Sequence, residues 1–303
     1  MNETTMTDAP APIDLLVAAL RAGDLDFGQP VEKVRADFEA TLATIPVAPD
    51  IAFARTDVGG VPALQCDAPG ADTGRVLLYM HGGAFISGSA GGYRALAAEL
   101  GRSAGARCLS LDYRLAPEHP FPAAVEDGVA AYRALLADGV APGHIVLGGD
   151  SAGGGLVVAV LLALRDAGLP MPAAALAISP WADMRCAAAS LADKAEEDPS
   201  LSEAGLRMAA GLYLAGSDAA EALASPVLAD LSGLPPLLIH VGSAEILIDD
   251  ALALARAAGM AGVDVRLEIW PRMVHVWHAF GFMLEEGRQA IGVAGEFLRA
   301  RMA

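Results

Sequence analysis

The sequence predicts an α/β fold in which helices cover both faces of a mostly parallel, eight-stranded sheet. Short apolar runs alternate with longer helical patterns from about residue 50 to the end of the chain. Most of the apolar runs are continuous, which is typical of parallel strands that are buried on both faces. With 303 residues, the chain is long enough to form one large domain of this kind.

Eight segments have the composition of strands. The first two flank Asp57-Val58-Gly59-Gly60, which is a hairpin signal. The strands are expected at residues 51–56, 61–66, 75–80, 107–111, 144–147, 173–178, 236–241 and 263–270. Helical patterns lie between them, at residues 93–102, 122–137, 152–167, 246–258 and 285–301.

Two segments do not fit this alternation. Residues 11–45 contain two amphipathic helical patterns, and residues 184–225 are helical and rich in acidic side chains. Because such pieces often cover a site at the edge of a sheet, we expect them to form one helical cap. A peripheral helical decoration is the alternative. The predicted domains are cap helices at 1–48, a catalytic core at 49–183 and 226–303, and a cap insertion at 184–225.

Composition argues against several classes of protein. The formal net charge of −17 disfavours nucleic-acid binding, which needs a basic surface. No apolar run reaches the roughly 18 residues of a membrane-spanning helix, and the first residues lack the features of a signal peptide, so a cytoplasmic protein is expected. Cys66, Cys108 and Cys186 are widely spaced, so we expect neither a disulfide framework nor a metal site.

The clearest functional motif is Gly149-Asp150-Ser151-Ala152-Gly153, which follows an apolar strand and precedes a long apolar helix. A serine on such a strand-to-helix turn projects its hydroxyl clear of the sheet, beside a helix N-terminus. A second match to this spacing, Gly101 to Gly105, ends a helical pattern, and we interpret it as a helix C-terminal cap. Ser151 is therefore the predicted nucleophile.

A serine hydrolase also needs donors for the oxyanion and a base. Gly82 and Gly83 directly follow the strand at 75–80, where their N–H groups can point at a bound carbonyl; an ordinary glycine turn is the alternative. The base is expected after the last strand, where His275 and His278 lie. His275 is favoured because it is closer to the end of the strand.

The acid that orients this base is expected after the strand at 236–241. Glu245 lies nearest to the end of that strand, on a turn from which a carboxylate can reach an imidazole N–H. Asp249 and Asp250 fall near the first turn of the next helix, where negative charge interacts favourably with the helix dipole. Glu245 is therefore the predicted acid.

With these motifs in place, the chain resembles the bacterial hormone-sensitive-lipase-like carboxylesterases of the α/β-hydrolase superfamily. Three stretches carry the resemblance, which spans essentially residues 50–303: His81 to Phe85, Asp112 to Ala124, and Gly149 to Gly154. It implies an α/β-hydrolase fold with a helical cap, and a serine esterase that needs no metal or cofactor.

The resemblance also assigns roles to residues. The nucleophile maps to Ser151, the base to His275, and the oxyanion donors to the amides of Gly82, Gly83 and Ala152. The chain departs from the family pattern in two places: Ala84 replaces the usual third glycine of the oxyanion stretch, and Glu245 replaces the more common aspartate.

The expected substrates are neutral esters with short acyl chains, cleaved through an acyl-enzyme on Ser151. A lactone, acetylated-metabolite or amide hydrolase with the same triad is the first alternative, and a noncatalytic ligand-binding member of the fold is the second. Aromatic or apolar residues near the predicted mouth are candidates for the substrate pocket, namely Phe85, Trp181, Leu212, Tyr213 and Trp277.

The strand at 263–270 is expected to form an edge of the sheet. Asp264, Arg266 and Glu268 alternate along it, and such charges protect an edge from pairing. Both a monomer and a homodimer formed through this edge are compatible with the sequence.

Overall fold

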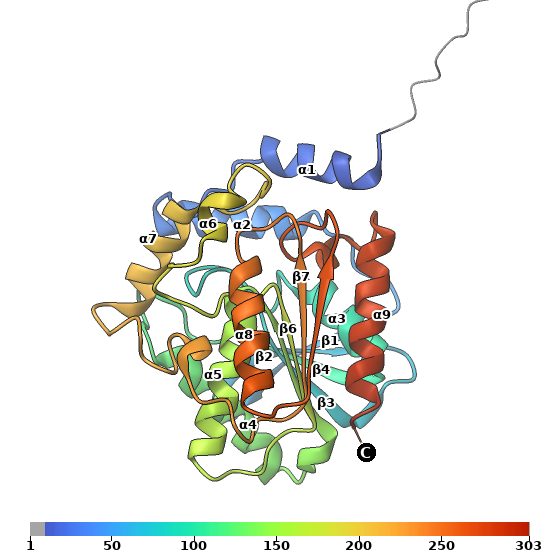
Figure 1. Ribbon diagram of the computed structural model, residues 1–303. Helices are drawn as coiled ribbons and strands as arrows, with labels where there is room; N and C mark the ends of the chain where they lie inside the picture. Colours follow the sequence, from blue (N-terminus) through green and yellow to red (C-terminus); the bar gives the residue numbers. More distant parts are fainter. Residues whose placement is uncertain (1–9, 303) are drawn as a thin grey trace, which may run out of the picture.

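The computed structural model describes residues 10–302 and has an eight-stranded sheet at its centre (Figure 1). The spatial order of the strands is β1-β2-β4-β3-β5-β6-β7-β8. β1 pairs antiparallel with β2, as β2 does with β4, and every other neighbouring pair is parallel. The strands are β1 Ala52–Val58, β2 Val61–Asp67, β3 Asp72–Met80, β4 Ala106–Leu111, β5 Ile145–Asp150, β6 Ala174–Ile178, β7 Leu237–Gly242 and β8 Val265–Trp270.

Helices cover both faces of the sheet, as the alternation of strand and helix predicts. α4 (Ala123–Ala137), α5 (Ala152–Asp166) and α8 (Ile248–Met260) pack on one face, and α3 (Arg94–Ala104) and α9 (Glu285–Arg299) pack on the other (Figure 1). β5 is buried along its whole length, which explains its continuous apolar sequence. The predicted α/β fold is confirmed, with strand ends that differ from the predicted ones by a few residues.

The parallel strands end level with one another. In the sheet register, Met80 pairs with Gly149, Asp150 with Ile178, and Gly242 with Trp270. The loops that follow β3, β5, β6, β7 and β8 therefore leave the sheet at the same edge. This is the edge at which open α/β sheets bind ligands.

The remaining helices lie together beyond that edge (Figure 1). They are α1 (Pro12–Ala22) and α2 (Val31–Ala43) from the N-terminal segment, with α6 (Ser190–Asp193) and α7 (Glu203–Leu214) from the segment predicted as an insertion. Arg21 of α1 donates a hydrogen bond to the carbonyl of Glu196 at 2.6 Å, which joins the two segments. Arg35 of α2 pairs with Glu118 at 2.7 Å and so ties this layer to the core.

Three smaller sequence expectations concern helix ends, membrane segments and cysteines. Gly105 caps the C-terminus of α3 in the left-handed conformation (φ 66°), as predicted for the second glycine-serine-glycine motif. No helix within residues 10–302 is long and apolar enough to cross a membrane. Cys66, Cys108 and Cys186 are buried free thiols.

Candidate active site

Ser151 lies on a strained turn between β5 and α5. Its backbone has φ 54° and ψ −123°, a conformation that costs a non-glycine residue about 1–3 kcal/mol and persists only where the surroundings enforce it. A Cβ on Gly149 would lie 2.4 Å from the carbonyl oxygen of Gly153, and a Cβ on Gly153 would lie 2.0 Å from the carbonyl oxygen of Met80. The turn therefore requires glycine on both sides of the serine.

The main chain around Ser151 is fixed by the neighbouring strand. The N–H of Ser151 donates to the carbonyl of Ile178 at 2.8 Å, and the carbonyl of Ser151 accepts from the N–H of Trp181 at 2.9 Å. Both partners belong to the end of β6 and the loop that follows it. These bonds hold the serine at the ligand-binding edge of the sheet.

Glu245 and His275 form a carboxylate–imidazole pair beside this serine. Nδ1 of His275 lies 2.7 Å from Oε2 of Glu245, whose side chain is completely buried. The other oxygen, Oε1, accepts hydrogen bonds from the N–H of Gly242 at 2.6 Å and from the hydroxyl of Ser179 at 2.8 Å. The oxygen of Ser179 also accepts the N–H of Val276 at 3.2 Å, so it braces both partners of the pair.

The pair determines the protonation of His275. Because Nδ1 faces a carboxylate, the proton of the neutral imidazole resides there and Nε2 is left as an acceptor. Burial lowers the pKa of His275, but the hydrogen bond and charge of Glu245, helped by the charges of Asp198 and Asp150, outweigh it and raise the pKa above its usual value. An imidazole in this state can accept a proton from a hydroxyl.

The other candidates for the base and the acid have hydrogen-bond partners outside the Glu245–His275 pair. Nε2 of His278 lies 3.0 Å from Nδ1 of His240, and burial holds the pKa of His278 well below its usual value. Asp249 accepts the N–H of Ser190 at 2.9 Å. Asp250 accepts the N–H groups that follow Trp181, at 2.8 and 3.0 Å, and burial raises its pKa to about 7.

The loop after β3 departs from the sequence prediction at Gly82. Its N–H was expected to contribute to the oxyanion hole, but it donates to Oδ1 of Asp150 at 3.1 Å and is therefore engaged elsewhere. Gly83 and Ala84 line the cavity that contains Ser151 and His275. Among the hydrogen bonds of residues 10–302, none uses the N–H of Gly83 or Ala84. These two N–H groups therefore remain available to a ligand bound in the cavity.

Asp150 is a component of the site that sequence reasoning missed. It is completely buried, and it accepts the hydroxyl of Tyr79 at 2.5 Å as well as the N–H of Gly82. Burial raises its pKa to about 6, although its hydrogen bonds with tyrosine hydroxyls act in the opposite direction. Asp150 directly precedes Ser151, so its bond with Gly82 connects the glycine loop to the turn that carries the serine. The aspartate of the glycine-aspartate-serine motif was the available signal.

The cavity that contains Ser151 and His275 has a volume of about 90 Å³. Its walls are mostly apolar and come from α1, α2, the turn around residue 200, α7 and the segment after His275. Several wall residues are supplied by the two segments that were predicted to form a cap: Leu20, Leu25, Phe27, Phe38, Leu42, Ile45, Leu201 and Leu206.

The five side chains predicted for the substrate pocket do not line this cavity. The ring of Phe85 stacks on that of Tyr213 with centroids 3.8 Å apart, and Trp181 lies 6.2 Å from Phe85, with Leu212 packed against the same core. Trp277 packs beside His240 in a different cluster. These large side chains are used for packing, and the cavity walls come instead from the amphipathic N-terminal helices.

Residues 10–302 contain no group of three or more His, Cys, Asp or Glu side chains placed to hold a metal ion.

Comparison with known proteins supports these observations. A family model for the α/β hydrolase fold matches residues 77–279. An acetyl-hydrolase of Streptomyces hygroscopicus is 57% identical over 231 residues, which cover 76% of this chain and 77% of the relative. An esterase of Acinetobacter venetianus is 33% identical over 253 residues, with 83% of each chain covered.

Solved structures give the same result over nearly the whole chain. An esterase/lipase from an uncultured bacterium is 49% identical, with a TM-score of 0.93 and coverage of 97% of this chain and 99% of that one. An esterase from the bacterial hormone-sensitive lipase family is 48% identical, with a TM-score of 0.94 and coverage of 97% and 100%.

Proposed function

This chain belongs to the α/β hydrolases, among the bacterial hormone-sensitive-lipase-like esterases, and we propose that it cleaves short-chain neutral esters through an acyl-enzyme on Ser151. The observation that carries the proposal is the juxtaposition at one cavity of a serine on a strained turn and an imidazole paired with a buried carboxylate at 2.7 Å. That arrangement matches the requirements of nucleophilic catalysis by serine.

The reaction proceeds in two steps. Nε2 of His275 accepts the proton of the Ser151 hydroxyl as its oxygen attacks the ester carbonyl. The oxyanion of the tetrahedral intermediate accepts hydrogen bonds from the N–H groups of Gly83, Ala84 and Ala152. The carbon–oxygen bond to the alcohol breaks, and His275 gives its proton to the leaving alkoxide.

Water then repeats the sequence on the acyl-enzyme. His275 takes a proton from water as the hydroxide forms a bond to the acyl carbon, and it returns the proton to Ser151 as the acid leaves. Glu245 holds the imidazole in the tautomer that leaves Nε2 free, and it stabilises the imidazolium that forms in each step. Ser179 positions Glu245 through the bond to Oε1.

The cavity supports small, neutral substrates. Its volume of about 90 Å³ is below the roughly 300–1,000 Å³ of sites that take drug-sized ligands. Its apolar walls favour hydrocarbon groups, and a net charge of −17 disfavours anionic ones. The similarity to an acetyl-hydrolase agrees with a small acyl group. In this proposal the N-terminal helices and residues 184–225 form the cap that closes over the ester.

The test is hydrolysis of p-nitrophenyl esters from acetate to palmitate by the wild type, Ser151→Ala and Ser103→Ala. Ser103 is a matched control because it occupies the second glycine-serine-glycine motif, where its hydroxyl donates to a carbonyl of α9 at 3.0 Å. We expect a short-chain maximum that falls by at least about 10³-fold in Ser151→Ala and persists in Ser103→Ala. Retention of most of the activity by Ser151→Ala would refute the proposal.

A further inference from the structure

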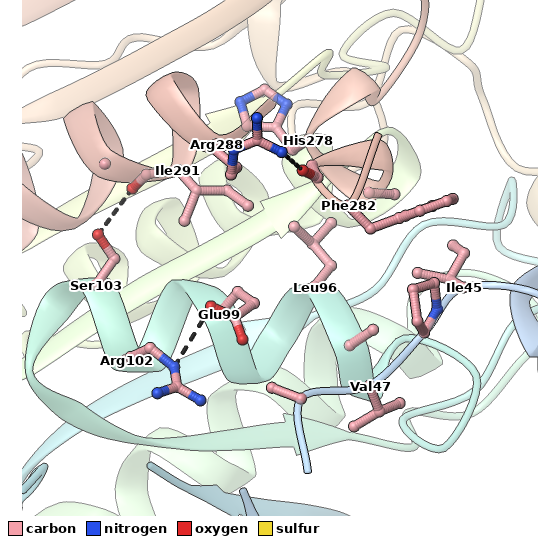
Figure 2. A pocket seen from close by; sticks show the side chains of 16 residues that line it. Ile45, Val47, Leu96, Glu99, Arg102, Ser103, His278, Phe282, Arg288 and Ile291 are labelled. Atoms are coloured by element: carbon pink, nitrogen blue, oxygen red, sulfur yellow. Dashed lines mark hydrogen bonds and ion pairs between the residues drawn. The ribbon is translucent and has the colours of Figure 1, made fainter. Parts of the chain in front are cut away.

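A second, larger cavity lies beside the one that contains Ser151, and the two share part of their walls. Figure 2 shows the side chains that line the larger cavity. The larger cavity has a volume of about 570 Å³, against about 90 Å³ for the smaller one. Ile45 and Ala279 line both cavities. Because each contributes to both walls, these two residues lie in the partition between the cavities.

The partition is attached to ordered structure on both sides. Ile45 follows α2, is buried, and donates its N–H to the carbonyl of Leu42 at 3.1 Å. Ala279 lies four residues after His275, and its N–H donates to the carbonyl of Val276 at 3.1 Å. The partition is thus built from the cap on one side and from the segment that carries the proposed base on the other.

The larger cavity offers mainly hydrocarbon to a guest. Several of its polar side chains are already engaged: Arg102 pairs with Glu99 at 3.4 Å, Arg288 donates to the carbonyl of Gly281 at 2.6 Å, and Ser103 donates to a carbonyl of α9 (Figure 2). Among the described residues that line it, His278 has a buried Nδ1 without a hydrogen-bond partner. The labelled apolar side chains around the space are Ile45, Val47, Leu96, Phe282 and Ile291 (Figure 2). An alkyl chain is the guest that such walls suit.

The chemistry of the proposed reaction indicates which part of the ester the partition limits. The alcohol leaves after the first step, whereas the acyl group stays bonded to Ser151 until water releases it. We assign the space beside Ser151 to the acyl chain, since the acyl group is the part of the ester that stays there through both steps. A chain that outgrows about 90 Å³ meets Ile45 and Ala279 before it can reach the larger space.

We propose that Ile45 and Ala279 set the upper limit of acyl-chain length, and that the larger cavity is a latent subsite for longer acyl chains. This inference rests on the proposed function, because it assumes an acyl group on Ser151. Trimming the partition joins the two cavities and converts a short-chain esterase into one that accepts medium chains.

The experiment measures kcat/KM for p-nitrophenyl acetate, butyrate and octanoate in the wild type, Ile45→Ala and Ile269→Ala. Ile269 is a matched control, since it makes the same chemical change at an exposed position on β8. We expect the octanoate-to-acetate ratio to rise on the order of tenfold or more in Ile45→Ala, because further methylenes of the octanoyl chain then leave water for an apolar site. Ile269→Ala should keep the wild-type ratio.

Ile45→Ala truncates a large buried side chain, which destabilises a fold. A variant that enlarges a side chain of the partition, Ala279→Leu, therefore tests the proposal without creating a cavity. Ala279→Leu fills space in the partition and should lower the butyrate-to-acetate ratio, while Ile45→Val should show a smaller gain for octanoate. Unchanged ratios in Ile45→Ala and Ala279→Leu, with acetate still hydrolysed, would overturn the proposal. So would a gain confined to longer alkyl acetates, which vary the alcohol.

Failure of this inference is distinct from failure of the proposed function. If acetate hydrolysis depends on Ser151 but the chain-length ratios are unchanged in Ile45→Ala and Ala279→Leu, only the proposal that the partition limits acyl-chain length is contradicted. Hydrolysis that persists in Ser151→Ala contradicts the acyl-enzyme, and the partition proposal fails with it.

Discussion

The carboxylate of Asp198 accepts the backbone N–H of Ile246 at 2.9 Å, directly after Glu245 in the chain. The carbonyl of the same Ile246 accepts the hydroxyl of Ser190 at 2.6 Å. Asp198 and Ser190 both belong to the segment at 184–225. The peptide groups beside the proposed acid are therefore held by the proposed cap, so the position of Glu245 depends on how that segment is seated.

Asp198→Asn tests the electrostatic part of this coupling. The negative charge of Asp198 contributes to the raised pKa of His275, and His275 must be neutral to act as a base. Removing the charge lowers that pKa, so the acid limb of the pH profile of kcat/KM should move to lower pH. Asp193→Asn, at an exposed position of the same segment, is the control. An equal shift in both variants, or none in Asp198→Asn, would contradict the coupling.

Glu245→Gln and Asp249→Asn distinguish the two candidate acids. Glutamine does not hold His275 in the required tautomer or stabilise the imidazolium, so kcat should fall by about 10³–10⁴-fold. Asparagine at 249 can still accept the N–H of Ser190, and activity should stay near that of the wild type. Steady-state kinetics on acetate esters gives the answer, and the reverse ranking would reassign the acid.

Ser179→Ala tests the brace behind the carboxylate. It removes a hydrogen bond to Oε1 of Glu245 and an acceptor for the N–H of Val276. Loss of the hydrogen bond to Glu245 raises the activation free energy by about 1–2 kcal/mol, so kcat should fall roughly 5–30-fold with little change in KM. Ser243→Ala, which removes a hydroxyl bonded to the N–H of Arg272, is the control. A change confined to KM would assign Ser179 to substrate binding instead.

Asp150→Asn tests the buried carboxyl next to Ser151. Its pKa of about 6 in the folded protein exceeds the usual 3.8, so the folded state binds the proton more tightly than the unfolded chain does. In the wild type, the contribution of this tighter proton binding to the unfolding free energy is complete below about pH 4 and is lost as the pH rises through 6. The unfolding free energy of Asp150→Asn relative to wild type should therefore grow over this range, by up to roughly 3 kcal/mol.

Urea unfolding at a series of pH values measures this difference. The exposed Asp166→Asn, at the end of α5, serves as the reference. A difference that stays flat between pH 4 and 7 would show that the carboxyl of Asp150 titrates at its ordinary pKa.

Much of the fold and of the candidate site was predictable because local sequence specifies it. Continuous apolar runs mark the buried parallel strands, and two glycines around Ser151 mark a turn on which a Cβ would collide with the main chain. Glu245 and His275 were predicted from their places after two consecutive strands. The structure brings them within hydrogen-bonding distance because β7 and β8 are parallel neighbours.

The rest depends on contacts between residues that are distant in sequence. The bond from Gly82 to Asp150 spans 68 positions, and no local pattern indicates that the N–H of Gly82 is used there rather than at the oxyanion. The cavity walls come from amphipathic helices whose pattern shows an apolar face but not what it covers. Aromatic residues near the predicted mouth were interpreted as pocket residues, yet the rings of Phe85 and Tyr213 stack on each other in the core.

The most direct test of the acyl-enzyme is mass spectrometry of the wild-type protein after treatment with diethyl p-nitrophenyl phosphate. The serine of an esterase attacks phosphorus and releases p-nitrophenol, and the diethylphosphoryl group stays on the serine oxygen. We predict one such group per chain, on the peptide that contains Ser151, together with loss of ester hydrolysis. An unlabelled protein, or a label on another residue with Ser151 unmodified, would contradict the account.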